Sequence, residues 1–188
     1  MAGADAIFIA VGTPARRGDG HADLRYVMAA TEEIAATISG PMIVVTKSTV
    51  PVGTGDQVEA MLRQHRPELA VPVVSNPEFS ARRRRDADFE RPDRIVVGTT
   101  DPHARDVMRA IYRSLSINES PILFTDRRTS KLTKYAANAF LATKITFINE
   151  IADLCEAVGA DVQDVSRGNL LDNRIGKKFL HAGPGYGG

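Results

Sequence analysis

The sequence contains a single cysteine, Cys155, and therefore cannot form an intrachain disulfide. This fits a reducing cytoplasm, where protein thiols are kept reduced. Cys155 lies among apolar residues of a predicted helix, and we interpret it as a packed, inert thiol. A reactive thiol is the alternative interpretation.

Long apolar runs and an excess of one charge are also missing. No run approaches the roughly 20 residues of a membrane-spanning helix, and the N-terminal segment lacks the basic start of a signal peptide. The net charge of +1 gives no reason to expect nucleic acid or an acidic membrane as a partner. With 188 residues, 43% of them hydrophobic, the chain is long enough for one globular domain, or one domain plus a smaller appendage.

Strand-like runs alternate with helical patterns over the first two thirds of the chain. We predict strands at residues 6–11, 42–46, 71–74, 95–97 and 122–124, and helices at residues 24–38, 53–65 and 102–115. Asp101 and Pro102 are typical of an N-cap followed by the first helical residue. Strand and helix in repetition indicate a mostly parallel sheet that is covered by helices on both faces.

Proline is absent from residues 129–158, and glycine is absent there until Gly159 follows. The segment predicts one long helix of roughly 40 Å. Its apolar residues spread over more than one face, so one side can pack on the sheet and another on a partner. A second, short helix is predicted from Asp161, as its cap, to Arg167.

Polar residues follow several of the predicted strands. AVGTP (10–14), KSTVPVG (47–53) and SNPEF (75–79) each stand at a strand end, and KYAAN (134–138) places Lys134 and Asn138 on one helical face. Open α/β sheets build ligand sites in this way. Glu78 is a candidate base or ligand for a hydroxylated compound, although an ordinary strand end is also polar.

Seven motifs stand in order along the chain: AVGTP, KSTVPVGT, SNPEF, DFERPDRIVVG, TKYAANAFLATKITFINEIADLCE, RIG and FLHAGPGYGG. The set closely resembles the UDP-glucose/GDP-mannose dehydrogenase family, from Ala4 to Gly188. The resemblance implies that residues 1–126 are the C-terminal half of a Rossmann-like NAD-binding domain with a parallel sheet. It implies that residues 127–188 are an incomplete central helical domain for dimerisation and substrate binding.

The resemblance further implies an NAD-dependent oxidation. Members of the family convert the C6 alcohol of a nucleotide sugar to a carboxylate with two NAD molecules in succession, and a cysteine holds the intermediate covalently. The wording of the motifs favours UDP-glucose as the substrate and UDP-glucuronate as the product. A homodimer formed through the helix at 129–158 is also implied.

Site residues can be carried over one by one from the resemblance. Thr13 and Thr49 match threonines that line the NAD site, and Thr49 also helps to position the hydrolytic water. Glu78 matches a glutamate near the reacting carbon, Lys134 a lysine that stabilises the oxyanion at C6, and Asn138 its asparagine partner. The residues implied to bind the nucleotide sugar, besides Glu78, Lys134 and Asn138, are Phe179, Leu180, His181, Gly183, Gly187 and Arg174, the last reaching the substrate of a neighbouring subunit.

The sequence departs from the family pattern at several points. Arg82 stands where the family has a glutamate near cofactor and substrate, and we count it among the cofactor-binding residues. The arginine run at 82–85 is interpreted as a solvated loop, with a nucleic-acid patch as the alternative. Lys131 occupies a helix position that is usually acidic.

Two functional features of the family, a phosphate-binding turn and a catalytic cysteine, are not found where they are expected. No G-x-G-x-x-G turn precedes the first strand, and no nucleophilic cysteine follows the glycine-rich segment. We therefore expect these 188 residues alone to be an inactive part of such an enzyme. The alternatives are a non-catalytic dimerisation module and an interrupted gene product that scarcely folds.

Overall fold

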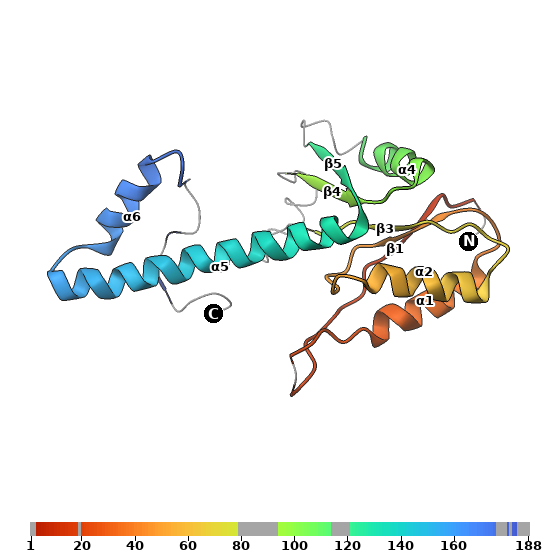
Figure 1. Cartoon of the computed structure of the whole chain (residues 1–188), viewed down its shortest axis with the longest axis horizontal. Helices are drawn as coiled ribbons and strands as arrows, with labels where there is room; N and C mark the ends of the chain where they lie inside the picture. Colours follow the sequence, from red (N-terminus) through yellow and green to blue (C-terminus); the bar gives the residue numbers. More distant parts are fainter. Residues whose placement is uncertain are drawn as a thin grey trace. The chain divides into compact units, whose positions relative to one another are not determined.

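The computed structural model describes residues 3–18, 20–78, 94–113, 121–175, 180 and 182–183. The chain divides into two compact units, residues 1–134 and residues 135–188, which we call the first and the second unit. The first unit contains a five-stranded sheet (Figure 1). Its strands are β1 (Ala6–Ile9), β2 (Ile43–Thr46), β3 (Val73–Ser75), β4 (Ile95–Gly98) and β5 (Ile122–Thr125).

The strands lie in the order β1-β2-β3-β4-β5. Neighbours pair in parallel except β3 and β4, which meet antiparallel through the single pair Ser75 and Gly98. Ile9 pairs with Thr46, and Thr46 pairs with Ser75, so β1, β2 and β3 end at the same level. The predicted α/β class with a mostly parallel sheet is confirmed.

Helices cover both faces of this sheet (Figure 1). Helices α1 (Arg25–Thr37) and α2 (Thr54–His65) pack on one face, where Val44 joins their buried residues. Helix α4 (Pro102–Arg113) packs on the other face, against Ile43 and Val45. Because successive side chains of a strand point to opposite faces, the unbroken apolar run of β2 serves two cores.

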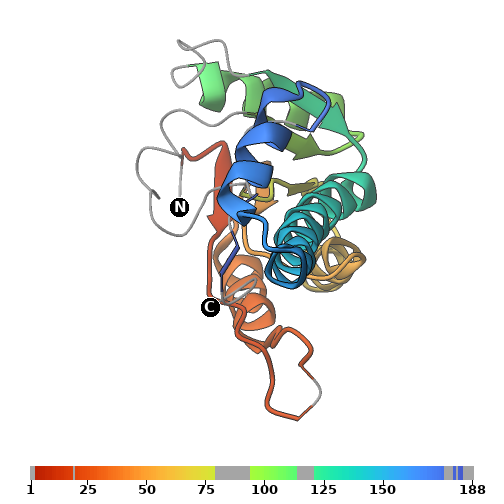
Figure 2. The ribbon, with the colours of Figure 1, turned by 90° about the vertical axis from the view of Figure 1, so that its left-hand side faces the viewer.

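The predicted strand boundaries shift by a few residues. β1 ends at Ile9 rather than at Val11, because the Val11 carbonyl accepts a hydrogen bond from Ser48 Oγ (2.7 Å) beyond the strand pairing. β3 begins at Val73 rather than at Val71, since Pro72 has no N–H for a strand pairing. After β1, the segment that leads to α1 forms a narrow loop, which is closed by an isolated antiparallel bridge between Ala15 and Ala22 (Figure 2).

Helix α5 (Arg127–Val158) begins in the first unit and continues into the second. Gly159, with φ +73°, ends it, and the Ala160 N–H closes on the Cys155 carbonyl at 2.9 Å. Helix α6 (Val162–Leu171) follows and runs four residues beyond the predicted end at Arg167, with Gly168 inside it. That prediction was wrong, because one glycine inside a helix costs only about 1 kcal/mol.

The two predicted aspartate caps are confirmed. Asp101 Oδ1 accepts the Ala104 N–H at 2.7 Å at the start of α4. Asp161 Oδ1 accepts the Gln163 N–H at 2.7 Å at the start of α6. Each carboxylate thus satisfies a backbone donor that has no partner within its own helix.

The second unit has a small buried core that includes Ile148, Cys155 and Leu180. The thiol of Cys155 is buried and forms no disulfide, as the sequence predicts. Within the described ranges, no helix combines the length and the apolar character that crossing a bilayer requires.

Candidate functional site

Three polar segments leave the sheet at the level where β1, β2 and β3 end. They are residues 11–13 after β1, residues 47–49 after β2 and residues 76–78 after β3. In open α/β sheets, ligands bind outside the carboxyl ends of the strands. We call this region the carboxyl edge.

The first two segments are tied together by hydroxyl groups. Thr13 Oγ1 donates to the Thr49 carbonyl at 2.8 Å. Ser48 Oγ donates to the Val11 carbonyl at 2.7 Å. Thr49 itself is exposed and Thr13 is half-buried. The hydroxyl oxygen of Thr13 keeps acceptor capacity for a ligand, and a Cβ on the neighbouring Gly12 would meet no atom within 4 Å.

The segment after β3 is fixed by a buried asparagine. Asn76 Nδ2 donates to the Val96 carbonyl at 2.9 Å, and Asn76 Oδ1 accepts the hydroxyl of Tyr112 from α4. Burial raises the pKa of Tyr112 to about 12, so the phenol stays protonated and donates. This network holds the turn that ends at the half-buried Glu78.

Glu78 acts electrostatically on two lysines of the first unit. Burial lowers the pKa of Lys134 on α5, and the Glu78 carboxylate opposes that shift. The same two causes act on the pKa of Lys47 after β2. The structure thus brings Glu78 and Lys134 close enough to interact, at the edge where Thr13 and Thr49 also lie.

Lys131 is a residue of this region that the sequence analysis did not assign to the site. Only 4% of it is exposed, and its Nζ donates to the Ser48 carbonyl at 3.0 Å and to the Thr46 carbonyl at 3.5 Å. Burial lowers its pKa to about 8. One signal was available: Lys131 lies three positions before Lys134 and therefore on a neighbouring part of the same helix face.

The other predicted residues that the structure describes belong to the second unit. Asn138 is half-buried on α5. Arg174 is exposed and forms an ion pair with Asp172 at 2.6 Å. The side chain of Leu180 is buried, and Gly183 is exposed. Arg82, Phe179, His181 and Gly187, together with the arginine run, lie outside the described residues.

Side chains of α5 and α6 hold the segment that contains Leu180 and Gly183. Lys144 Nζ donates to the Ile175 carbonyl at 3.1 Å. Ser166 Oγ donates to the Leu180 carbonyl, and Asn149 Oδ1 accepts the Gly183 N–H at 3.0 Å. Sequence reasoning missed these anchors, because their role depends on where the segment returns to the helices.

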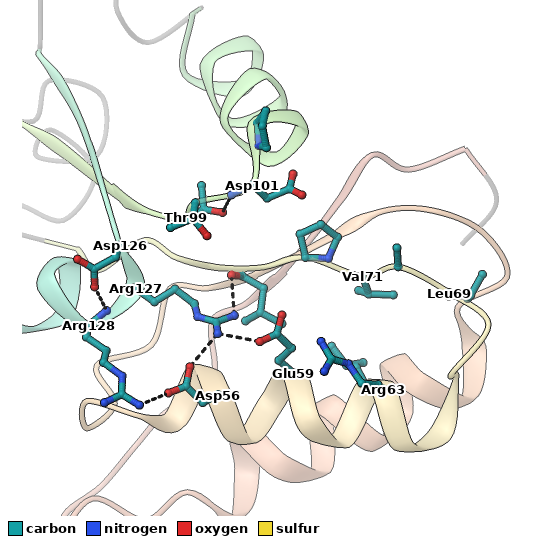
Figure 3. Close-up of a pocket in the computed structure, with 16 residues that line it drawn as sticks. Asp56, Glu59, Arg63, Leu69, Val71, Thr99, Asp101, Asp126, Arg127 and Arg128 are labelled. Atoms are coloured by element: carbon teal, nitrogen blue, oxygen red, sulfur yellow. Dashed lines mark hydrogen bonds and ion pairs between the residues drawn. The ribbon is translucent and has the colours of Figure 1, made fainter.

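A cavity of about 770 Å³ lies elsewhere in the first unit, between α2 and the starts of α4 and α5 (Figure 3). Arg127 reaches both Asp56 and Glu59 there, at 2.7 Å each. Asp126 accepts backbone N–H groups of the first turn of α5. The charged groups at its centre are thus paired with each other, and none of the predicted site residues lines this cavity.

Comparison with known families agrees with the motifs. Residues 1–116 match the NAD binding domain of the UDP-glucose/GDP-mannose dehydrogenase family, and residues 128–188 match its central domain. The chain belongs to this family, as the motifs predicted, and NAD is the cofactor that the matched domain binds.

The chain is 66% identical to UDP-glucose 6-dehydrogenase of Rhizobium meliloti, over all of this chain and 44% of that protein. It is 46% identical to UDP-glucose 6-dehydrogenase of Pseudomonas aeruginosa, over all of this chain and 42% of that protein. A solved UDP-glucose dehydrogenase from the archaeon Pyrobaculum islandicum superposes with a TM-score of 0.89 at 41% identity, covering 98% of this chain and 43% of that one. The chain therefore spans less than half the length of these relatives.

The residues of the carboxyl edge fit NAD and a nucleotide sugar in their chemistry. The hydroxyls of Thr13 and Thr49 provide polar contacts, and the open space at Gly12 lets a ligand approach the backbone. Lys47 and Lys134 place positive charge beside them. Both ligands carry phosphates and hydroxyls, which such groups bind.

Proposed function

We propose that this chain contributes the carboxyl edge and the sugar-binding helices of an NAD-dependent nucleotide-sugar dehydrogenase that oxidises UDP-glucose to UDP-glucuronate. The observation that carries the proposal is the electrostatic interaction of Glu78 with Lys134 beside the strand-end threonines. Its context is a chain 66% identical to a UDP-glucose 6-dehydrogenase. Residues 1–126 then form the later half of the NAD-binding domain, and residues 127–188 form part of the central domain.

Each residue has a role that its surroundings support. NAD, when bound, would supply the acceptor for the hydride that leaves the sugar C6. Thr13 and Thr49 would contact the cofactor with their hydroxyls. The Lys134 ammonium stabilises negative charge that develops on the C6 oxygen, because a cation in a partly buried site interacts strongly with a nearby anion. Glu78 accepts a proton or a hydrogen bond from the sugar hydroxyl.

The second unit contributes the remaining sugar contacts in this proposal. Asn138 supplies an amide to the sugar, and Arg174 supplies a guanidinium to a neighbouring substrate. The segment with Leu180 and Gly183 binds the nucleotide sugar through its backbone. The hydrogen bonds from Ser166 and to Asn149 support this role, because they fix the backbone at both described points.

A covalent step on a thiol needs a cysteine that is not among these 188 residues. Cys155 is the one cysteine of the sequence, and it is buried in α5. We therefore propose that the 188 residues bind ligands but do not complete the oxidation alone. Formation of NADH by the purified chain with UDP-glucose and NAD would contradict this.

The test of the proposed roles is calorimetric titration of the chain with UDP-glucose and with NAD. Lys134→Met is expected to weaken UDP-glucose binding by about tenfold or more, because a charge-assisted contact is lost. Thr133→Ala is the matched control on the same turn of α5, since its hydroxyl bonds only to the Thr129 carbonyl of its own helix. Equal affinities of the Lys134→Met variant and the unchanged chain would refute the assignment.

A further inference from the structure

Lys131 is a buried amine with an unusual set of neighbours. Its Nζ lies 3.0 Å from the Ser48 carbonyl and 3.5 Å from the Thr46 carbonyl, where β2 ends. Among the residues that the structure describes, no carboxylate forms an ion pair with it. Methionine at this position would fill a similar volume without the cost of burying a charge. The Lys131 ammonium therefore has a role that side-chain packing alone would not require, namely its hydrogen bonds to these carbonyls.

The two carbonyls connect Lys131 to the segments of the carboxyl edge that follow β2 and β3. Ser48 is the neighbour of Thr49, whose carbonyl in turn accepts the Thr13 hydroxyl. The Thr46 carbonyl also accepts the Asn76 N–H at 3.0 Å, at the start of the turn to Glu78. Lys131 thus bonds to the backbone on which both strand-end segments depend.

The helix that carries Lys131 also carries Lys134, three residues further on. A fixed contact at Lys131 sets where this turn of α5 stands relative to the end of β2. Charged groups nearby include Lys47, whose pKa burial lowers, Glu78, which acts on Lys47 and Lys134, and Arg94, which acts on Lys134. Desolvation alone accounts for the lowered pKa of Lys131, which agrees with an ammonium bonded to neutral carbonyls.

We propose that Lys131 is a positioning residue, which joins α5 to the end of β2 and so holds Thr49 and Glu78 in register with Lys134. It contacts no substrate in this role. The proposal rests on the proposed function for what is positioned, but the contact itself can be tested without any ligand.

The primary experiment measures amide hydrogen exchange by NMR in the whole chain. The N–H groups of Lys47 and Asn76 are hydrogen-bonded at the carboxyl edge, and those of Ile95 and Thr99 serve as references in β4 and its end. In Lys131→Met, exchange at the edge amides is expected to rise by about tenfold more than at the references. Lys131→Arg keeps the charge and the donors and should restore most of the protection. An equal rise at all four amides, or no rise at the edge, would overturn the proposal.

A second measurement uses the unchanged chain, so that the proposal stays testable where Lys131→Met fails to fold. Relaxation of the lysine ammonium groups should show Lys131 Nζ to be as rigid as the backbone amides of the same turn of α5. Free rotation and fast reorientation of the Lys131 ammonium, as in a solvated lysine, would show that its contact with the Ser48 carbonyl fixes nothing.

A kinetic comparison then links the contact to catalysis in an enzyme that contains this sequence. Lys131→Met should lower kcat by about tenfold while the KM for UDP-glucose changes by less than about threefold, and Lys131→Arg should recover most of kcat. Unchanged kcat in Lys131→Met would overturn the positioning role. No turnover in the unchanged enzyme would instead count against the proposed function, and the exchange result would still decide for or against the contact.

Discussion

Lys131 is a buried amine whose charge destabilises the folded protein near neutral pH. Its pKa is about 8 in the folded protein, against 10.5 for an ordinary lysine. Between these two values the unfolded chain binds this proton more tightly, so the free energy of unfolding increases as pH rises through the window. The full difference is about 3 kcal/mol. At pH values below about 8 the cost of the buried charge is fully present.

The prediction is tested by urea unfolding at several pH values from about 7 to about 9.5, where Tyr112 stays protonated. The pKa values of Lys47 and Lys134 are lowered as well and act in the same direction. The comparison with Lys131→Met therefore isolates the one residue: the variant should gain less stability with pH than the unchanged chain. Parallel curves would show that Lys131 has an ordinary pKa.

Tyr112 provides a second prediction for a single residue. Its hydroxyl donates to Asn76 Oδ1 in the interior, so Tyr112→Phe leaves a buried acceptor without its partner. We expect a loss of about 1–3 kcal/mol in the free energy of unfolding. Tyr26→Phe is the matched control, because Tyr26 is 54% exposed on α1, and it should change stability by less than about 0.5 kcal/mol. Similar losses in both variants would mean that the buried hydrogen bond contributes little.

Helix α5 packs tightly against Gly98, the last residue of β4. A Cβ at this position would lie 2.6 Å from Ser130 Cβ and 2.9 Å from Arg127 Cα. Because a backbone atom cannot move aside like a side-chain end, Gly98→Ala must displace the start of α5. We expect destabilisation by about 1–3 kcal/mol, measured by thermal or urea unfolding.

Gly40 is the matched control for this packing argument. A Cβ there would meet no atom within 4 Å, and its φ lies outside the left-handed region. Gly40→Ala should be neutral, or stabilising by up to about 1 kcal/mol. If Gly98→Ala were as stable as Gly40→Ala, the start of α5 would have to shift at little cost.

At the scale of whole elements, the order and type of the helices and strands were predictable because hydrophobic periodicity is local. The residues at which the elements end were harder to predict. β1 ends before its predicted boundary because the Ser48 hydroxyl, far along the chain, donates a hydrogen bond to the Val11 carbonyl. Helix α6 continues past Arg167 because the single glycine at position 168 costs too little to end the helix.

The apolar surface of α5 leads to a prediction for the whole molecule. Phe140, Phe147 and Leu154 are all at least half exposed, at 63%, 50% and 56%, and they recur every seven residues. That spacing makes a continuous stripe along a helix. We propose that a second copy of the chain covers this stripe and forms the homodimer.

Light scattering coupled to size exclusion tests the dimer. Phe147→Glu places a charge in the stripe and should shift the molar mass to that of the monomer. Glu156→Lys is the control, because nine positions further along a helix is the opposite side, and it should stay dimeric. A monomeric unchanged chain, or a dimeric Phe147→Glu variant, would contradict this interface.

The elements, the family and the chemical type of most candidate residues could be predicted from the sequence, because motifs and periodicity are properties of neighbouring residues. It also placed Thr13, Thr49 and Glu78 at strand ends. What the sequence left open was which distant groups meet. The folded structure was needed to show that the Glu78 carboxylate acts on Lys134, and that Lys131, which the sequence marked only as a departure from the family pattern, is buried against the Ser48 carbonyl. Desolvation and hydrogen bonding depend on what the fold brings alongside a side chain, and no short stretch of sequence contains that information.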